Sequence, residues 1–393
     1  MNSHATPYDV IVIGLGAMGS AATWQLAKRG ARVLGIDRFS PPHGFGSSHG
    51  DTRITRLAIG EGDHLTPLAI RSHEIWREIE RALDVELLTQ NGGLIVSAPG
   101  PKSFTHVEGF FANTIAAAKH HGIAHELLDA QEIRNRFPPF RVRDGEFGYF
   151  ESSAGFVRPE TAIASQLELA KRAGADFRTQ ERVVRFEEAA GRVEIETEAA
   201  RYRADRIVLT AGAWLPSLLE PTLASLFRIY RQVLFWFALD APVSRFEPAR
   251  FPVFIRELTG EAQGIYGFPA LDGKAGGLKI ATETYATATS PDLVERVVSE
   301  EEIAAMHGRF VAPYLEGVGR GCVKTAVCLY TVTPDFGFVI DWLPGSERVL
   351  IASPCSGHGF KHSAAIGEML ADYATAAPIR FQSAPFGFAR FAR

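Results

Sequence analysis

Three glycines and an aspartate near the start of the chain have the types and spacing of a dinucleotide-binding turn. Gly14, Gly16 and Gly19 form the string GLGAMG, and Asp37 ends the apolar segment that comes next. Glycines permit a tight turn and a close approach to a diphosphate, whose charge is favoured by the free N–H groups at a helix start. The aspartate can accept a hydrogen bond from a ribose hydroxyl. This pattern predicts a dinucleotide cofactor, but it does not separate FAD from NAD(P).

The turn needs a strand before it and a helix after it, and the sequence supplies both. Apolar periodicity also predicts a later helix that begins at a proline and ends before Gly174. The segments expected to form this unit are a strand at 8–13, helices at about 18–29 and 159–173, and strands at 32–37 and 177–186. A strand, a helix and a strand in this order open a parallel sheet.

Composition and charge exclude several other classes of protein. A chain of 393 residues, of which 46% are hydrophobic, can bury a large core, and two lobes are expected. A net charge of −4 gives no basic face for a nucleic acid. The N-terminal apolar run is too short for a signal peptide or a membrane span, so we expect a cytoplasmic protein without a membrane partner. Cys322, Cys328 and Cys355 lack the paired spacing of zinc or redox sites, so neither a metal nor a disulfide is expected.

Five motifs, in order along nearly the whole chain, are more specific than the glycine turn. They are GSSHGDTRITR at 46–56, YRQV at 230–233, GFP followed by GGLKI at 267–280, AVCLYTVTPD at 326–335 and SGHGFK at 356–361. In these motifs the chain resembles the family of monomeric sarcosine oxidase and N-methyltryptophan oxidase. The resemblance implies an FAD-dependent enzyme that oxidises a small secondary or N-methyl amino acid.

The resemblance and the predicted elements together imply an α/β fold, in detail a two-lobed α+β arrangement. A Rossmann-like FAD-binding domain is expected to consist of residues 1–85, 148–225 and 325–393. An interleaved substrate domain with an antiparallel sheet is expected at 86–147 and 226–324, where aromatic strands such as QVLFWFALD occur.

Cys328, in the string AVCLYT, stands at the position through which the family binds its flavin. The resemblance implies a covalent FAD, attached as an 8α-S-cysteinyl thioether. Because the thiolate is the nucleophilic form of cysteine, nearby positive charge favours this bond. His49 and Arg53, in the motif at 46–56, are implied to supply that charge. The alternative role for both residues is to anchor the loop through ion pairs.

Two cations are implied to bind the carboxylate of the substrate. They are Arg56 and Lys361. The planar guanidinium of an arginine and the point charge of a lysine together favour a monocarboxylate over a neutral amine. The alternative role for Lys361 is to cap nearby backbone groups. Such a clamp holds the reacting C–H bond against the flavin. Tyr266 and Tyr330 are implied to border the substrate, and Glu61 resembles an acid of a mobile entry loop. The alternative for each of the three is a role in packing alone.

Lys279, in GGLKI, occupies the family position of a lysine that assists the reaction of reduced flavin with O2. A cation about 4 Å from a superoxide-like anion stabilises that anion by several kcal/mol at an intermediate dielectric. The alternative is that this lysine faces solvent, as lysines in strands normally do.

Departures from the family make sarcosine itself doubtful as the substrate. Glu283 stands where the family has a histidine, and an acid beside the amine favours a cationic substrate. Ile255 and Arg256 replace an apolar pair, and an inward-facing Arg256 would select a substrate with an acidic or polar tail. Pro354 stands where glycine is usual before SGHG.

The remaining positions expected to contact FAD come from the opening turn, from the segments after predicted strands and from the last glycine turn. With Arg53, Cys328 and Lys361, the full set is Gly14, Gly16, Ala17, Met18, Gly19, Asp37, Arg38, Ser47, Thr52, Val183, Ala211, Gly212, Trp214, Gly357, His358, Gly359 and Phe360.

Together these residues predict the oxidation of an amino acid by transfer of a hydride from its α carbon or N-methyl group to the flavin. The imine product would hydrolyse, or open later if the substrate is a ring such as pipecolate or proline, and O2 would be reduced to hydrogen peroxide. The expected partners are therefore a small amino acid and O2, in a monomeric enzyme.

Three alternatives to this activity stay open. The first is a flavin amino-acid dehydrogenase with another electron acceptor, which a solvent-facing Lys279 would favour. The others are an NAD(P)-dependent dehydrogenase and a non-catalytic regulator that binds a nucleotide.

Overall fold

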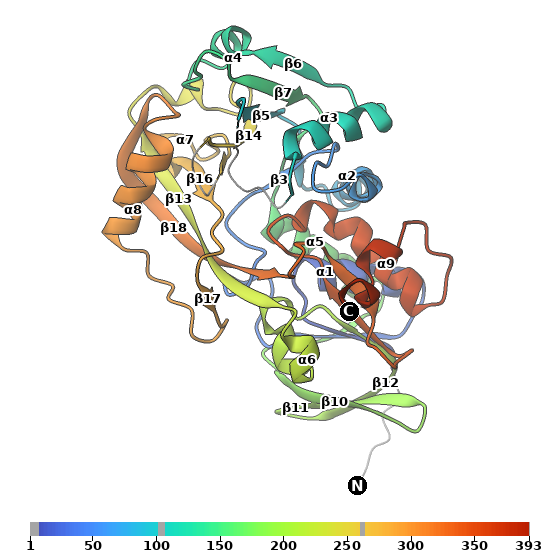
Figure 1. The fold of residues 1–393 in the computed structure, drawn as a ribbon. Helices are drawn as coiled ribbons and strands as arrows, with labels where there is room; N and C mark the ends of the chain where they lie inside the picture. Colours follow the sequence, from blue (N-terminus) through green and yellow to red (C-terminus); the bar gives the residue numbers. More distant parts are fainter. Residues whose placement is uncertain (1–7, 101–106, 260–263, 393) are drawn as a thin grey trace.

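A twisted sheet built around the opening turn forms one half of the molecule, whose computed structural model describes residues 8–100, 107–259 and 264–392 (Figure 1). Its strands are β1 (Tyr8–Ile13), β2 (Val33–Ile36), β9 (Asp176–Arg178), β10 (Val183–Ala189), β11 (Arg192–Thr197), β12 (Arg201–Leu209), β19 (Val339–Trp342) and β20 (Val349–Ser353). β9, β2, β1, β12 and β20 pair in parallel, while β10 and β11 form an antiparallel hairpin beside β12. β1, β2 and β20 are mostly buried, which explains their continuous apolar sequences.

The helix after the glycine turn is held in a layer of helices on this sheet. α1 (Ala17–Lys28) packs between α5 (Pro159–Arg172) and α9 (Ser363–Ala374), and α9 also contacts α2 (Thr66–Leu83). Apolar residues of these helices and of β1, β12 and β20 share one core. The start of α1 therefore has a fixed position at the ends of the parallel strands.

A second, mostly antiparallel sheet forms the other half. Its strands are β5 (Gly93–Ser97), β6 (Glu126–Asp129), β7 (Phe147–Glu151), β13 (Arg228–Leu239), β14 (Val253–Arg256), β15 (Ile265–Gly267), β16 (Leu278–Thr282), β17 (Ala288–Thr289) and β18 (Val318–Val332). β13 and β18 form a long ribbon that reaches from this sheet toward the first one (Figure 1).

Short elements complete this half and join it to the first. Helices α3 (Phe110–His120), α4 (Ala130–Arg136), α7 (Gly273–Gly276) and α8 (Glu300–Met306) lie along it or at its ends. α6 (Pro221–Ala224) lies instead beside the first sheet, and its Leu223 packs against the core of that sheet. A small sheet of β3 (Arg53–Thr55), β8 (Gly155–Val157) and β4 (Leu88–Thr89) lies between the two larger sheets. β3 matters for the site because it begins at Arg53 and is followed by Arg56. None of the helices in the described residues has the length and apolar character to cross a membrane.

The expected α/β, two-lobed fold is confirmed, with one local correction. β1 has the predicted bounds, and α1 begins and ends one residue earlier than expected. The single strand predicted at 177–186 is wrong, because the chain breaks after Arg178 and re-enters the sheet at Val183. Gln180 in this break has a φ of 58°, which a regular strand does not allow.

The division of the chain into two discontinuous domains stays a proposal. In its favour, every strand of the first sheet lies within 1–85, 148–225 or 325–393. β7 and β18 each run across one of the proposed boundaries, so the two domains share continuous strands.

Candidate active site

Two cavities meet between the two large sheets. The larger, which we call the cofactor cleft, has a volume of about 1370 Å³ including its open mouth and lies along the glycine turn. The smaller, which we call the substrate cavity, has about 830 Å³ and is walled in part by β14, β15, β16 and β18. Arg53, Tyr330, Gly357 and Phe360 line both cavities. A group bound at this junction is therefore accessible from both sides.

The glycine turn forms one wall of the cofactor cleft. Gly14 has a φ of 90°, and a Cβ on Gly19 would lie 1.8 Å from the carbonyl oxygen of Gly14, so both positions require glycine. Gly16 is the N-cap of α1, and it provides no side-chain cap to the helix start. The first N–H groups of α1 can therefore bind a diphosphate.

Asp37 lines the same cleft and also braces the turn. Its Oδ2 accepts a hydrogen bond from the backbone N–H of Leu15 at 2.7 Å, and its Oδ1 accepts one from Phe39 at 2.7 Å. Each carboxylate oxygen can accept a second hydrogen bond, so this bracing is compatible with the predicted contact to a ribose hydroxyl.

The lining of the cofactor cleft fits FAD. Ser353 lines the cleft, and its buried Oγ has no hydrogen-bond partner among the described residues. A buried hydroxyl without a partner is destabilising, and a cofactor with polar edges would satisfy it. A dinucleotide requires hydrogen-bond donors for its diphosphate and polar partners for its ribose and ring edges. The start of α1, the Asp37 carboxylate and the Ser353 hydroxyl provide these groups.

Cys328 lies on β18 beside the junction of the cavities and is buried. Its Sγ is 3.4 Å from His49 Nε2 and 3.5 Å from Arg53 Nη2. Burial raises the pKa of the Cys328 thiol, but the charge of Arg53 and the hydrogen bond with His49 outweigh burial and lower that pKa to about 7. Tyr330, two residues further along the strand, points to the same face and lines both cavities. A reactive thiol therefore lies next to the junction.

Lys279, on β16, lines the substrate cavity and does not face solvent. Its Nζ donates hydrogen bonds to the carbonyl oxygens of Gly50 at 2.6 Å and Thr52 at 2.8 Å, and to Thr52 Oγ1 at 3.1 Å. Burial, and next the charge of Arg53, hold the pKa of Lys279 well below its usual value. The lysine is thus fixed in the cavity wall close to Arg53.

The two predicted carboxylate-binding cations lie side by side, and Glu61 bridges them. Its Oε2 accepts a hydrogen bond from Arg56 Nη2, and its Oε1 lies 3.2 Å from Lys361 Nζ. All three side chains are less than 10% exposed. Burial lowers the pKa of Lys361 to about 8, although Glu61 acts in the opposite direction. A carboxylate therefore already occupies the position that we assign to the substrate carboxylate.

Loop geometry positions this clamp. Glu151, at the end of β7, accepts hydrogen bonds from the backbone N–H groups of Leu57 at 2.7 Å and Ala58 at 3.2 Å. The Arg56 guanidinium donates to the Ala58 carbonyl and lies 4.9 Å from the centre of the Phe110 ring. Arg56 is thus oriented by its own loop and by α3.

Tyrosines and an acid form another wall of the substrate cavity. The hydroxyls of Tyr266 and Tyr330 are 3.5 Å apart, and Tyr285 donates to Glu283 Oε2 at 3.2 Å. Burial and the charge of Glu283 raise the pKa of Tyr266, so the phenol stays neutral at physiological pH.

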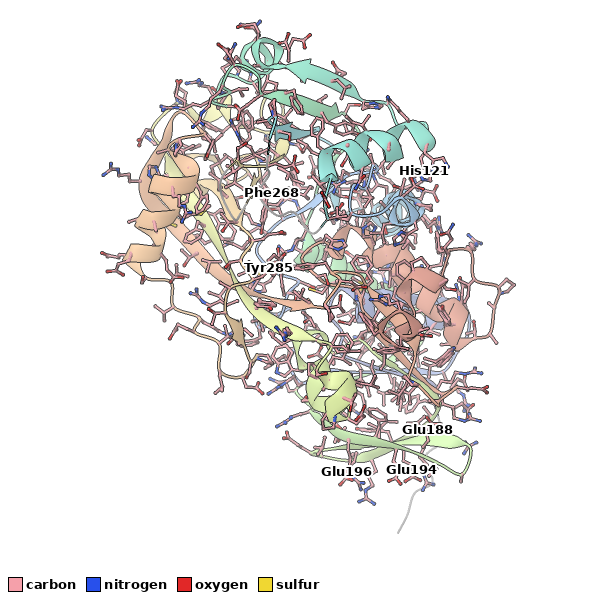
Figure 2. The ribbon with its side chains drawn as sticks, viewed as in Figure 1. His121, Glu188, Glu194, Glu196, Phe268 and Tyr285 are labelled. Carbon is pink, nitrogen blue, oxygen red and sulfur yellow. The ribbon has the colours of Figure 1, made fainter. Side chains whose placement is uncertain are left out.

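This wall lies in the interior of the molecule. Figure 2 shows Phe268 and Tyr285 in the middle of the molecule, whereas Glu188, Glu194 and Glu196 lie on the β10–β11 hairpin at the lower edge of the view.

The expectation that Arg256 faces the substrate was wrong, while Ile255 does line the substrate cavity. Neighbouring residues of a strand point to opposite faces, and Arg256 points into the core. There its Nη2 lies 2.6 Å from a carboxylate oxygen of Glu146, and its Nη1 donates to the carbonyl of Arg141 at 3.0 Å. Its role is an ion pair, so it gives no reason to expect a substrate with an acidic tail.

Most of the other predicted residues line one of the two cavities. Three residues predicted to contact the cofactor line the substrate cavity instead, namely Thr52, His358 and Lys361. Three others line neither cavity and pack directly behind the cavity walls, namely Gly19, His49 and Cys328. The predicted residues in the cofactor cleft are Gly14, Gly16, Ala17, Met18, Asp37, Arg38, Ser47, Arg53, Val183, Ala211, Gly212, Trp214, Gly357, Gly359 and Phe360.

Several lining residues were not predicted. Glu181 and Arg182 line the cofactor cleft just before Val183, and their position after a parallel strand was a usable signal. Phe110 and Phe268 line the substrate cavity from segments far apart in the sequence. Phe268 lies in the GFP motif, which was a usable signal, whereas no local pattern marks Phe110.

Comparison with known proteins shows the family of the chain. The family model described as FAD dependent oxidoreductase matches residues 9–373. A monomeric sarcosine oxidase of Streptomyces avermitilis is 40% identical over 379 residues, which cover 95% of this chain and 96% of that protein. An N-methyl-L-tryptophan oxidase of Salmonella arizonae is 36% identical over 98% of this chain and its own full length.

A solved structure has the same fold. The open form of NikD, described as an unusual amino acid oxidase, has a TM-score of 0.82 at 24% identity and covers 98% of both chains. With a nucleotide cleft that fits FAD and two relatives above 30% identity along their whole lengths, the chain belongs to the FAD dependent oxidoreductase family, in the branch of monomeric sarcosine oxidase and N-methyl-L-tryptophan oxidase.

Proposed function

We propose that the protein oxidises a small secondary or N-methyl amino acid to an imine and passes the electrons to O2, which yields hydrogen peroxide. The observation that carries this proposal is the pair of buried cations, Arg56 and Lys361, in a cavity that shares a wall with the cofactor cleft. A monocarboxylate is the ligand that such a pair selects.

When bound, FAD supplies an acceptor for two electrons and returns them to O2. The chain's own residues hold and orient the reactants. Cys328, whose thiol is activated by Arg53 and His49, would attach the cofactor through a thioether to the flavin 8α carbon. The S–H bond and one C–H bond of the 8α carbon would break, both protons would pass to solvent, and the two electrons would be taken up by the flavin and returned to O2. Arg56 and Lys361 would bind the substrate carboxylate after Glu61 moves away, and Lys279 would stabilise negative charge on O2.

The substrate class rests on the clamp, the acid and the relatives. Glu283, in the wall of the same cavity, favours an amine that arrives as a cation. The names of the two relatives point to N-methyl amino acids. A cyclic imino acid such as pipecolate or proline has the same carboxylate and secondary amine, and it belongs to the proposed class.

Anaerobic titration of the purified yellow protein tests the proposed reaction. Sarcosine, N-methyltryptophan, pipecolate and proline are added separately, and the flavin absorbance near 450 nm is followed. At least one of these amines should bleach the flavin, and admission of air should restore the colour with formation of hydrogen peroxide. If none of them bleaches it, the proposed substrate class is wrong.

Oxygen, rather than another electron acceptor, is favoured by the position of Lys279. A solvent-facing Lys279 would have favoured the dehydrogenase alternative, but the side chain is buried in the wall of the substrate cavity. If colour returns only with an artificial acceptor and not with air, the dehydrogenase alternative is right.

Binding of a carboxylate should weaken as the pH rises through about 8, the pKa of Lys361 in the unliganded protein. Below this pH Lys361 is an ammonium ion, and above it the neutral amine no longer attracts the anion. Propionate has no amine and isolates this effect, and its Kd can be read from the shift it causes in the flavin spectrum. We expect the Kd to rise by up to about tenfold per pH unit above 8.

A Lys361→Met variant provides the control for this pH dependence. Its propionate Kd should be higher than that of the wild type at pH 7 and nearly constant across the same range. A wild-type Kd that stays constant between about pH 7 and 9 would contradict the assignment of Lys361 to the clamp.

We also propose that the protein is a cytoplasmic monomer. Cys322, Cys328 and Cys355 form no disulfide with one another, which is typical of a reducing compartment. The name of the 40% identical relative supports a monomer.

A further inference from the structure

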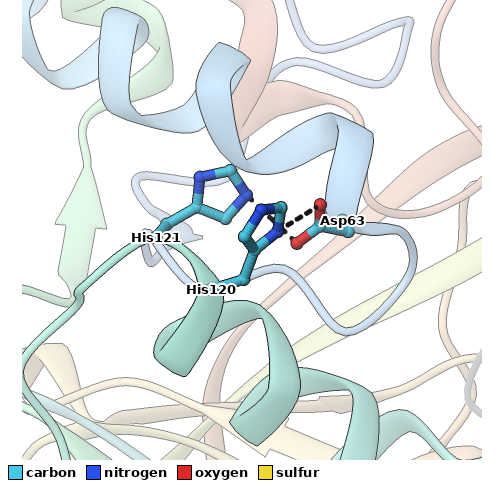
Figure 3. A group of neighbouring side chains, drawn as sticks. All are labelled: Asp63, His120 and His121. Atoms are coloured by element: carbon cyan, nitrogen blue, oxygen red, sulfur yellow. Dashed lines mark hydrogen bonds and ion pairs between the residues drawn. The ribbon is translucent and has the colours of Figure 1, made fainter.

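Outside both cavities, two histidines and an aspartate point toward one another at the surface. His120 is the last residue of α3 and His121 is its C-cap, and Asp63 opens the short helix Asp63–Leu65 that precedes α2. Figure 3 shows both imidazoles beside the Asp63 carboxylate: His120 Nδ1 is 3.0 Å from Oδ2, and His121 Nε2 is 3.0 Å from Oδ1. The three side chains come from segments that are nearly 60 residues apart, so the fold creates the cluster.

We propose that Asp63, His120 and His121 bind a divalent transition-metal ion such as Zn²⁺. Their ligand atoms all lie within 4.8 Å of one another. In a tetrahedral site with bonds of about 2.0 Å, neighbouring ligand atoms are roughly 3.3 Å apart, which is close to the two observed N···O distances. Imidazole nitrogens and a carboxylate suit Zn²⁺, Ni²⁺ and Cu²⁺ better than Mg²⁺ or Ca²⁺.

The exposure of the cluster allows it to close around an ion. The His120 side chain is 69% exposed and Asp63 49%, so rotation of these side chains meets little packing resistance, whereas His121 is 20% exposed and more fixed. Binding requires neutral imidazoles, whose lone pairs become the metal bonds, and any imidazole proton is released to the buffer. A water molecule would complete the coordination.

Asp63 belongs to the same loop as Glu61, which bridges the two cations of the clamp. Asp63 is two residues from Glu61, and the two cations are Arg56 and Lys361. The same loop is tight against α3, because a Cβ on Gly60 would lie 2.4 Å from Thr114 Oγ1. α3 thus contacts the loop at Gly60 and again at Asp63, near its C-terminal end.

A metal at this position would tie the loop to the end of α3 and resist the movement of Glu61. The substrate carboxylate can bind Arg56 and Lys361 only after Glu61 leaves them, so the metal should weaken carboxylate binding. By linkage, the carboxylate must weaken metal binding by the same factor. This coupling rests on the proposed function of the clamp, whereas metal binding itself does not.

Calorimetric titration of the tag-free holoenzyme with Zn²⁺ tests the site without any turnover. We expect one ion per chain, no comparable binding of Mg²⁺, and an affinity at least about tenfold lower in each of Asp63→Asn, His120→Ala and His121→Ala. His64→Ala is the matched control, because His64 lies in the same loop with its ring against Phe386, 5.5 Å away, and should leave the affinity unchanged.

Copper provides an independent spectroscopic test. Oxidised flavin has no electron paramagnetic resonance signal, so the spectrum of one bound Cu²⁺ should show coupling to two imidazole nitrogens, lost in His120→Ala. Absence of Zn²⁺ binding, or binding that none of the three substitutions weakens, would overturn the site and leave the cluster as an ordinary surface ion pair.

The coupling is measured with propionate. Saturating Zn²⁺ should raise the propionate Kd about fivefold or more in the wild type, and not in His120→Ala. Zn²⁺ binding with an unchanged propionate Kd would overturn the coupling but not the site. Loss of propionate binding in every form, by contrast, would count against the proposed function of the clamp.

Discussion

Replacement of Lys279 by Met is expected to slow the reaction of the reduced flavin with O2 by about 10²- to 10³-fold, with little change in the reduction of the flavin by the amine. Lys279 is buried, and its ammonium group donates three hydrogen bonds to the segment that carries Arg53. The first electron that O2 receives creates an anion, and a fixed cation in a water-poor cavity stabilises it far more than a solvated one. Met keeps the volume of the side chain and removes the charge.

Stopped-flow absorbance separates the two half-reactions. The enzyme is first reduced by the amine without oxygen and then mixed with O2, and each rate is recorded from the flavin band. Lys279 Nζ lies 5.4 Å from the centre of the Trp236 ring, and Lys324 Nζ lies 4.6 Å from the centre of the same ring. Lys324→Met is therefore a matched control, because Lys324 is 48% exposed and paired with Asp51. The control should react within about twofold of the wild type.

Two further outcomes bear on the role of Lys279. Lys279→Arg retains the charge and should recover part of the oxygen reactivity, which a purely structural role would not predict. Unchanged oxygen reactivity in Lys279→Met would show that the lysine does not act on O2, although O2 would remain the electron acceptor.

The parts of the fold that could be predicted are those that local rules determine. β1 and α1 follow directly from an apolar run, a glycine turn and a periodic segment, and Gly14 and Gly19 are required by the backbone itself. The break between Arg178 and Val183 could not be predicted, because it depends on how the chain leaves one strand and pairs again with β11.

The errors at the site also have physical causes. Ile255 and Arg256 are neighbours on one strand, so at most one of them could face the substrate, and alternation alone was a signal against assigning both. The sequence could not show that Arg256 pairs with Glu146, which is 110 residues away. The bridge of Glu61 across Arg56 and Lys361 also depends on tertiary contacts that no spacing reveals.

Replacement of Cys328 by Ser is expected to abolish covalent attachment of the flavin. In the wild type, acid precipitation should leave the yellow colour in the pellet, whereas in Cys328→Ser the colour should pass to the supernatant. Cys355→Ser is the matched control, because Cys355 is free and lines the cofactor cleft. It should keep its flavin in the pellet. Colour that leaves the pellet only in Cys355→Ser would assign the attachment to the other cysteine.

The rate of attachment should follow the ionisation of the Cys328 thiol. The pKa of this thiol is about 7 in the unliganded protein, because Arg53 and His49 lower it more than burial raises it. Roughly a tenth of the thiol is therefore thiolate at pH 6 and roughly nine tenths at pH 8. Flavin-free protein incubated with FAD should therefore form the bond several-fold faster at pH 8. His49→Asn removes one of the two groups that stabilise the thiolate and so raises the pKa of Cys328. Attachment should therefore become fast only at a higher pH. If the rate is independent of pH over this range, ionisation of Cys328 does not limit attachment.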